Sequence, residues 1–232
     1  MLSRAAIAIL LALMMPAVAQ ARDLEASYPA NDLEVIQITA GVGEIILDSG
    51  SDANIRVEVE LKSSDEADPD VDALIDEAEL VVTMRNGKVE LEIVFPGQSA
   101  SDDDPEIQQK WRVLAPQSLA AIVEIGVGVV DVSGLGGGVE ASIGVGETRV
   151  DVPGGSLRLK TSVGEVSVRS GSGNIGDVDL DSNIGEVSLR VNGDDIDPQR
   201  SMFVGSRLSW SGGGDDDIDV RVNVGQIDVR LD

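Results

Sequence analysis

Acidic side chains that recur at one place in a repeated motif are the first residues here that could do chemistry. Glu147, Glu165 and Glu186 each follow the glycine of a Val/Ile-Gly-Glu unit. If these units stack, the carboxylates form a column and repel one another by roughly 1 kcal/mol per pair in water. Ca²⁺ would relieve that repulsion, since it takes several carboxylate and carbonyl oxygens. A solvated polar face screened by salt explains the same pattern without a metal, and we favour it.

A second acidic candidate follows three glycines near the end of the chain. The run Asp215-Asp216-Asp217-Ile218-Asp219 follows Gly212-Gly213-Gly214 and is similar to calcium-binding β-roll repeats. Those sites need tandem glycine-rich nonapeptides, and no second copy is present. An acidic turn is therefore the simpler interpretation, and Asp215 and Asp217 remain secondary calcium candidates. No metal site is assigned, and Ca²⁺ is the one cofactor considered.

The composition excludes several classes of site. The chain has no His and no Cys, so a Ser-His-Asp triad, a thiol nucleophile, a Cys/His zinc site and a disulfide are all excluded. Its 17 basic and 42 acidic residues give a net charge of -25, which makes nucleic acids and anionic membrane surfaces poor partners. An Asp/Glu pair could still cleave glycosidic bonds. Sugar clefts favour aromatic platforms, however, and we expect Trp111 and Trp210 to cap the ends of the fold instead, so no catalytic residue is assigned.

The first 21 residues have the three parts of a secretory signal. Arg4 provides the positive region, Ala5–Met15 the apolar run, and Ala19-Gln20-Ala21 the small-residue cleavage site. No later stretch approaches the roughly 20 apolar residues that a membrane helix needs. We therefore expect an exported chain, periplasmic or extracellular, without a transmembrane segment in its mature part.

A glycine motif occurs six times and predicts the architecture. Its form is [VI]-G-[EQV]-[VIT]-x-[VL], and the copies start at Val42, Val127, Val145, Val163, Ile184 and Val224. The glycines from 128 to 185 are spaced 18, 18 and 21 residues apart. Apolar residues recur four and six positions before each copy, which is the period of a strand. Each repeat is then a strand, a bend at glycine, and a second short strand.

These repeats predict an all-β fold, a parallel β-solenoid (β-helix) with coils of roughly 18–21 residues; an antiparallel meander or sandwich is the alternative. We expect Val145, Val163 and Ile184 to fill a shared interior. Stacking in sequence order would place Glu140, Arg158 and Asp179 in one outward column, with signs that alternate. Ser142, Lys160 and Asp181 would form a second such column.

The remaining segments predict one domain over 22–232. An N-terminal β segment covers 22–115 and the repeats cover 116–232. Within the first part, 80–95 is expected to form a hairpin at Asn86-Gly87, because Asn-Gly favours a tight hairpin turn. A short helix is expected within 67–78, and an acidic polar loop over 98–106.

The repeats and their flanks resemble the bacterial putative adhesin domain, a secreted β-solenoid-like family whose members mostly lack a defined activity. The matching stretches are LEVIQI at 33–38 with GEI at 43–45, WRVLAP at 111–116, SVGEVSV at 162–168, NIGEVSL at 183–189 and VGQIDV at 224–229. The resemblance implies a non-enzymatic structural or binding domain of the cell envelope, and it brings no catalytic residues. The chain departs from the family pattern in the irregular stretch 190–217 and in its acidity, which would give this domain an acidic surface. Its partner would be an envelope or extracellular protein or glycan. The alternative is a carbohydrate-active β-helix enzyme.

Overall fold

The computed structural model of the chain describes residues 21–50, 53–63, 69–96, 107–171, 173–197, 199–200 and 205–232. The signal sequence, apart from Ala21, and the predicted polar loop over 98–106 lie outside these ranges. Every described element but one is a β-strand, so the all-β prediction is confirmed. The strands form one large mixed sheet of 14 strands within the described ranges.

Six long strands carry the glycine motif. They are β2 (Val35–Gly50), β7 (Ala120–Ser133), β8 (Val139–Val152), β9 (Leu157–Ser170), β10 (Ile175–Val191) and β14 (Asp216–Leu231). Shorter elements flank them on both sides. These are β1 (Ala21–Pro29), β3 (Asn54–Ser63), α1 (Pro69–Glu77), β4 (Glu79–Arg85), β5 (Lys88–Val94), β6 (Ile107–Pro116), β11 (Asp194–Ile196), β12 (Gln199–Arg200) and β13 (Ser206–Ser211).

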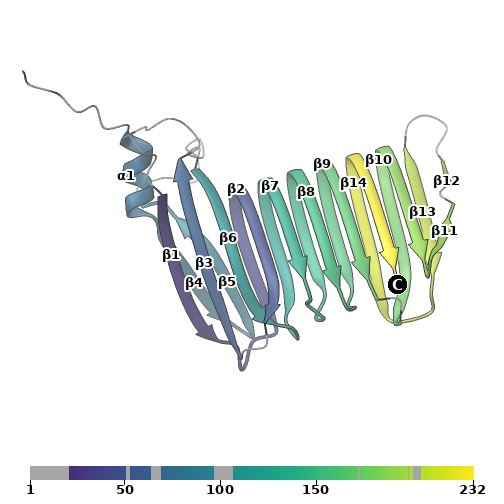
Figure 1. The fold of residues 1–232 in the computed structure, drawn as a ribbon, viewed down its shortest axis with the longest axis horizontal. Coiled ribbons are helices and arrows are strands. Elements are labelled where there is room, and N and C mark those ends of the chain that lie inside the picture. The colour runs from purple at the N-terminus through teal and green to yellow at the C-terminus, as the bar shows by residue number, and fades with distance from the viewer. Residues whose placement is uncertain are drawn as a thin grey trace, which may run out of the picture.

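Each long strand bends once, at the glycine of its motif, and turns back along a second face (Figure 1). The arms before the bend pair in the order β5-β2-β7-β8-β9-β14-β10-β13. The arms after the bend lie in the same order but are flanked by β6 and by β11 instead. The bends therefore line one long edge of the molecule. The direct connections from β7 to β8, from β8 to β9 and from β9 to β10 lie along the opposite edge, which we call the loop edge (Figure 1).

Repeats that follow each other in the chain stack in parallel and in register from β7 to β9. Gly128 is the Cα partner of Gly146, which is in turn the partner of Gly164. The expected succession is wrong at one place, because β14 lies between β9 and β10. Gly225 therefore separates Gly164 from Gly185. A motif that fits any rung equally well does not encode its position in the stack, so the order of the sequence could not reveal this insertion.

The interior lies between the two faces and is almost wholly aliphatic. The positions four and six residues before each motif are buried in all six repeats, as predicted; Leu157 and Leu159 are examples. The first residue of the motif is not buried. The prediction that Val145, Val163 and Ile184 fill the interior was therefore wrong, because these side chains are 45–50% exposed. The bend shifts the phase of the alternation, so the buried Ile143 and Thr148 are five residues apart, an odd number. The residue before the glycine then lies on the outside of the corner.

The N-terminal segment closes one end of this interior. The predicted hairpin is present as β4 and β5, and Asn86 and Gly87 both have positive φ at its turn. The predicted short helix is α1, which contacts β3 and β1. Trp111 is fully buried within the core and donates its indole N–H to the Gln109 side chain at 3.0 Å. It is thus a core residue near this end.

Candidate functional site

The bends carry a continuous line of exposed aliphatic side chains, which we call the aliphatic ridge. Its members follow one another across six neighbouring strands and are 37–50% exposed. In spatial order they are Val42, Val127, Val145, Val163, Val224 and Ile184. Neighbouring strands are about 4.8 Å apart, so the ridge is about 24 Å long.

The glycine next to each ridge residue explains why the bend is the same in every repeat. The six bend glycines have φ between +143° and +150°, a conformation that side chains with a Cβ rarely adopt. A Cβ on Gly146 would also lie 1.7 Å from the carbonyl oxygen of Gly128. The close approach of one strand's backbone to the next therefore requires glycine, and it holds the ridge residues in line.

Carboxylates lie in the column beside the ridge, and we call Glu44, Glu147, Glu165 and Glu186 the ridge carboxylates. Val129 and Gln226 complete this column. Two members have cationic partners: Glu44 pairs with Lys110 and Glu147 with Arg149, at 2.5 Å each. Glu165 and Glu186 are exposed and have no cationic partner within the described part of the chain. Negative charge at the ridge is thus least compensated over β9 and β10.

The structure brings the calcium candidates together only in part. Glu147 and Glu165 are Cα partners on adjacent strands, but Gln226 lies between Glu165 and Glu186. Within the described ranges no three acidic side chains cluster closely enough to hold a metal ion. The remaining candidates, Asp215 and Asp217, lie near the start of β14 at the loop edge, far along the strand from the bend. Calcium binding remains a prediction.

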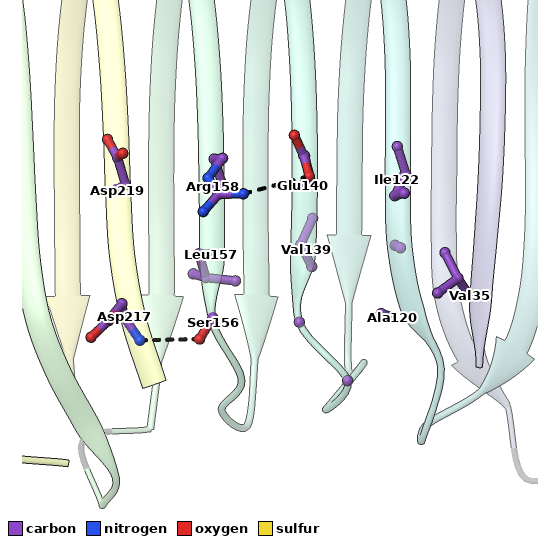
Figure 2. A pocket seen from close by; sticks show the side chains of 13 residues that line it. Val35, Ala120, Ile122, Val139, Glu140, Ser156, Leu157, Arg158, Asp217 and Asp219 are labelled. Carbon is purple, nitrogen blue, oxygen red and sulfur yellow. Dashed lines mark hydrogen bonds and ion pairs between the residues drawn. The ribbon is translucent and has the colours of Figure 1, made fainter. Parts of the chain in front are cut away.

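At the loop edge the acidic run makes structural hydrogen bonds. Asp217 accepts one from the Asp177 backbone N–H at 2.9 Å, and Asp216 accepts one from that of Gly155 at 3.0 Å. The Asp217 backbone N–H donates to the Ser156 hydroxyl at 3.1 Å (Figure 2). Asp216 and Asp217 therefore attach the inserted strand to both of its neighbours.

A shallow hollow of about 310 Å³ lies beside these residues, over the ends of the arms that precede the bend (Figure 2). Glu140, Asp217 and Asp219 line it, but each is engaged within the fold. Glu140 lies 3.9 Å from Arg158, and Asp219 lies 2.9 Å from Arg221. None of the described lining residues is aromatic.

Neither tryptophan stands beside that hollow. Trp111 is buried in the core, and Trp210 is partly buried against it, with its ring next to Gly212. Trp210 lies on β13, which pairs with β10 and β12, and its capping role stays a prediction. A sugar-binding cleft would place a carboxylate pair beside an aromatic side chain. The described residues that line this hollow do not form such an arrangement.

The outward columns differ from the expected ones because of the inserted strand. Asp219 lies between Arg158 and Asp179, and Arg221 lies between Lys160 and Asp181. The prediction that charge alternates strictly along each column is therefore wrong. Asp179 and Asp219 are neighbours in one column, and Lys160 and Arg221 are neighbours in the other. The Asp219–Arg221 ion pair along β14 compensates for both changes.

Three arginines also stand side by side in a column after the bend: Arg169, Arg230 and Arg190. Each has an acidic partner, which leaves this column locally neutral. The pairs are Arg169–Asp151 at 3.1 Å, Arg230–Asp228 at 3.1 Å and Arg190–Asp195 at 2.8 Å. The hydrogen bond that Arg190 donates to the Asp195 carboxylate raises the pKa of Arg190. On the same face, burial raises the pKa of the Asp131 carboxyl, against the lowering effect of Arg149.

The exposed ridge was not foreseen from the sequence, although a signal for it exists. Apolar positions before and after each glycine are both periodic, but the two series are offset by an odd number of residues. A strand that continued straight through the glycine could not bury both series. The residue next to the glycine therefore had to leave the interior.

The fold is that of a solved bacterial protein from Clostridium sporogenes, which is described as a putative cell adhesion protein. The TM-score is 0.54 at 16% identity, over 92% of this chain and 100% of the other. The resemblance inferred from the sequence is confirmed at the level of the fold, because this structural neighbour is a bacterial protein described as a putative cell adhesion protein.

Two further solved structures are described as putative adhesins. A putative adhesin from Bacteroides fragilis has a TM-score of 0.32 at 13% identity, over 90% of this chain and 97% of that one. One from Parabacteroides distasonis has a TM-score of 0.26 at 12% identity, over 91% and 97%. No protein-family model and no curated protein matches the sequence. Among the described residues, no helix has both the length and the apolar character to span a membrane.

Proposed function

We propose that the chain is an exported, non-enzymatic, adhesin-like binding domain of the bacterial cell envelope. Its scaffold is a parallel β-solenoid with one coil inserted out of sequence order. The observation that carries the proposal is the fold shared with the Clostridium sporogenes protein described as a putative cell adhesion protein, over nearly the full length of both chains. In-register parallel pairing of the repeats supports the solenoid description.

The same scaffold supports a role in binding rather than in catalysis. Aliphatic side chains from every repeat fill the interior, and stacked backbone hydrogen bonds join the repeats, so the outer surface is held rigidly. A rigid surface loses little conformational freedom when a partner binds. The carboxylates at the loop edge are engaged in internal bonds, which disfavours the alternative of a carbohydrate-active enzyme with an Asp/Glu pair.

The proposal is tested with purified protein, residues 22–232, coupled to beads. Retention of the beads is measured on surfaces coated with separated bacterial envelope proteins and envelope glycans. We expect saturable retention on one of these surfaces, and competition by the free protein. Uncoupled beads and beads with an unrelated acidic protein serve as controls. Absence of saturable retention, or release of reducing ends from the glycans, would contradict the proposal.

A further inference from the structure

We propose that the aliphatic ridge, with the ridge carboxylates beside it, binds an amphipathic helix of another protein, one with basic side chains next to its apolar stripe. This names the chemistry of a partner for the binding role proposed above and rests on that role.

The concentration of exposed apolar side chains on the ridge is the first argument. Nine large aliphatic side chains are exposed in the described part of the chain, and six of them are the ridge residues. The other three, Met84, Val94 and Leu114, are separate from this line. A contiguous exposed apolar patch with polar surroundings is typical of an interaction site. Since the interior is already filled by other residues, the core does not require aliphatic side chains at the bend.

The dimensions of the ridge favour a helix over an extended strand. The ridge presents one side chain about every 4.8 Å, whereas a helix presents its stripe with a pitch of about 5.4 Å. Side chains on one face of a strand repeat about every 6.8 Å, which differs more from the ridge spacing of about 4.8 Å than the helix pitch does. A helix of about 16 residues covers the ridge length of about 24 Å.

Charge decides which kind of helix fits. The ridge carboxylates run along one side of the ridge, and Glu165 and Glu186 lack a cationic partner among the described residues. The chain as a whole carries a net charge of -25. Two copies placed ridge to ridge would bring these like charges together, and an anionic bilayer would be repelled. A basic flank complements them, and helices bind through such apolar stripes in known complexes.

The arginine column is the competing surface, and it is less suitable. Arg169, Arg230 and Arg190 each form an ion pair within the protein. An anionic partner would have to displace these carboxylates and approach against the overall negative charge. Within the described ranges the apolar side chains of the ridge have no comparable internal partner and remain exposed.

The probe for the test is a labelled 16-residue peptide of Leu and Lys, with Leu at helical spacing. Fluorescence anisotropy measures its binding to the purified protein. Two peptides serve as comparisons: one with Glu in place of Lys, and one of the same Leu/Lys composition in strict alternation. We expect the helical Leu/Lys peptide to bind at least tenfold more tightly than either. Equal or tighter binding of the Leu/Glu peptide or the alternating peptide would overturn the proposal.

The apolar contribution is tested with the double variant Val145→Thr/Val163→Thr. Threonine keeps the β-branched shape, so a strand is still favoured while apolar surface is lost. We expect affinity for the helical Leu/Lys peptide to fall about tenfold, with an unchanged melting temperature. The matched control, Val94→Thr/Leu114→Thr, removes exposed apolar groups away from the ridge and should leave the affinity unchanged. Equal affinities for the two double variants would overturn the role of the ridge.

The contribution of charge is tested with Glu165→Gln/Glu186→Gln. We expect weaker binding of the helical Leu/Lys peptide and a smaller dependence on salt concentration. Glu25→Gln, on the exposed edge strand β1, is the control for loss of charge and should have little effect. The bead assay separates this inference from the proposed function. If wild-type beads are retained and the ridge variants are retained equally, the docking site is wrong while the binding role stands.

Discussion

The chain reverses direction between the two faces at both long edges of the molecule, but it does so by different means at each edge. At the ridge every repeat turns at one glycine with the same backbone conformation. At the loop edge the connections over 134–138, 153–156 and 171–174 differ in length and sequence. Backbone hydrogen bonds still attach these connections to neighbouring repeats, such as that from the Gly134 N–H to the Asp151 carbonyl of β8 at 2.8 Å.

The difference shows where repetition is required. At the ridge, backbone approaches backbone so closely that one residue type fits, and the motif recurs for that reason. At the loop edge, individual side chains such as Asp216 and Asp217 make bonds that no other repeat reproduces. The uniform edge therefore offers a regular surface, while the variable edge determines which strand lies where.

Substitution of a bend glycine should have the largest effect. Gly146→Ala places a Cβ against the Gly128 carbonyl oxygen and requires an unfavourable φ, so we expect a loss of about 3 kcal/mol or more in the free energy of unfolding. Gly173→Ala at the loop edge is the control, because a Cβ there meets nothing within 4 Å. Urea denaturation measures both. Similar losses for the two variants would show that the edges do not differ in their need for glycine.

A smaller loss is expected when the loop edge loses its carboxylates. Asp216→Ala/Asp217→Ala removes the hydrogen bonds to the backbone N–H groups of Gly155 and Asp177, at a cost of about 2 kcal/mol in total. Asp215→Ala should change the free energy of unfolding by less than about 0.5 kcal/mol. Asp215 is exposed, and the hydrogen bond described for it is donated by its backbone N–H, which the substitution retains. A double variant as stable as Asp215→Ala would remove the proposed role of this edge in holding β14.

A gain in stability is expected just beneath the ridge. The Thr148 hydroxyl is fully buried and has no hydrogen-bond partner among the residues that the structure describes, while its neighbours in the column, Val130 and Val166, are aliphatic. Thr148→Val should therefore raise the free energy of unfolding by about 1 kcal/mol. Thr39→Val, at an exposed position, should be nearly neutral. Thermal denaturation tests both, and a destabilised Thr148→Val would mean that the hydroxyl is needed at the bend.

Much of the fold could be predicted from the sequence because each copy of the sequence repeat adopts the same backbone geometry. A period of two around a fixed glycine predicts strand, bend and strand, and the buried pairs such as Val139 and Ala141 were identified correctly. The Asn86-Gly87 turn and the short acidic helix could also be predicted from local chemistry. These features depend on nearby residues alone.

The errors concern features that depend on distant parts of the chain. The exposure of Val145 follows from the phase shift at the bend, which a count of alternating residues does not include. The place of β14 depends on contacts of Asp216 and Asp217 with residues about 40 and 60 positions earlier. Columns built in sequence order therefore put Glu165 next to Glu186 and missed Gln226.

The insertion of β14 has a consequence for the order of folding. β14 pairs with β9 on one side and with β10 on the other, and both strands precede it in the chain. Neither can complete its hydrogen bonds until β14 has been synthesised, so we infer that the distal half stays open until then. Pulsed hydrogen exchange during refolding should show β9 and β10 becoming protected together with β14, and earlier protection of both would contradict this order.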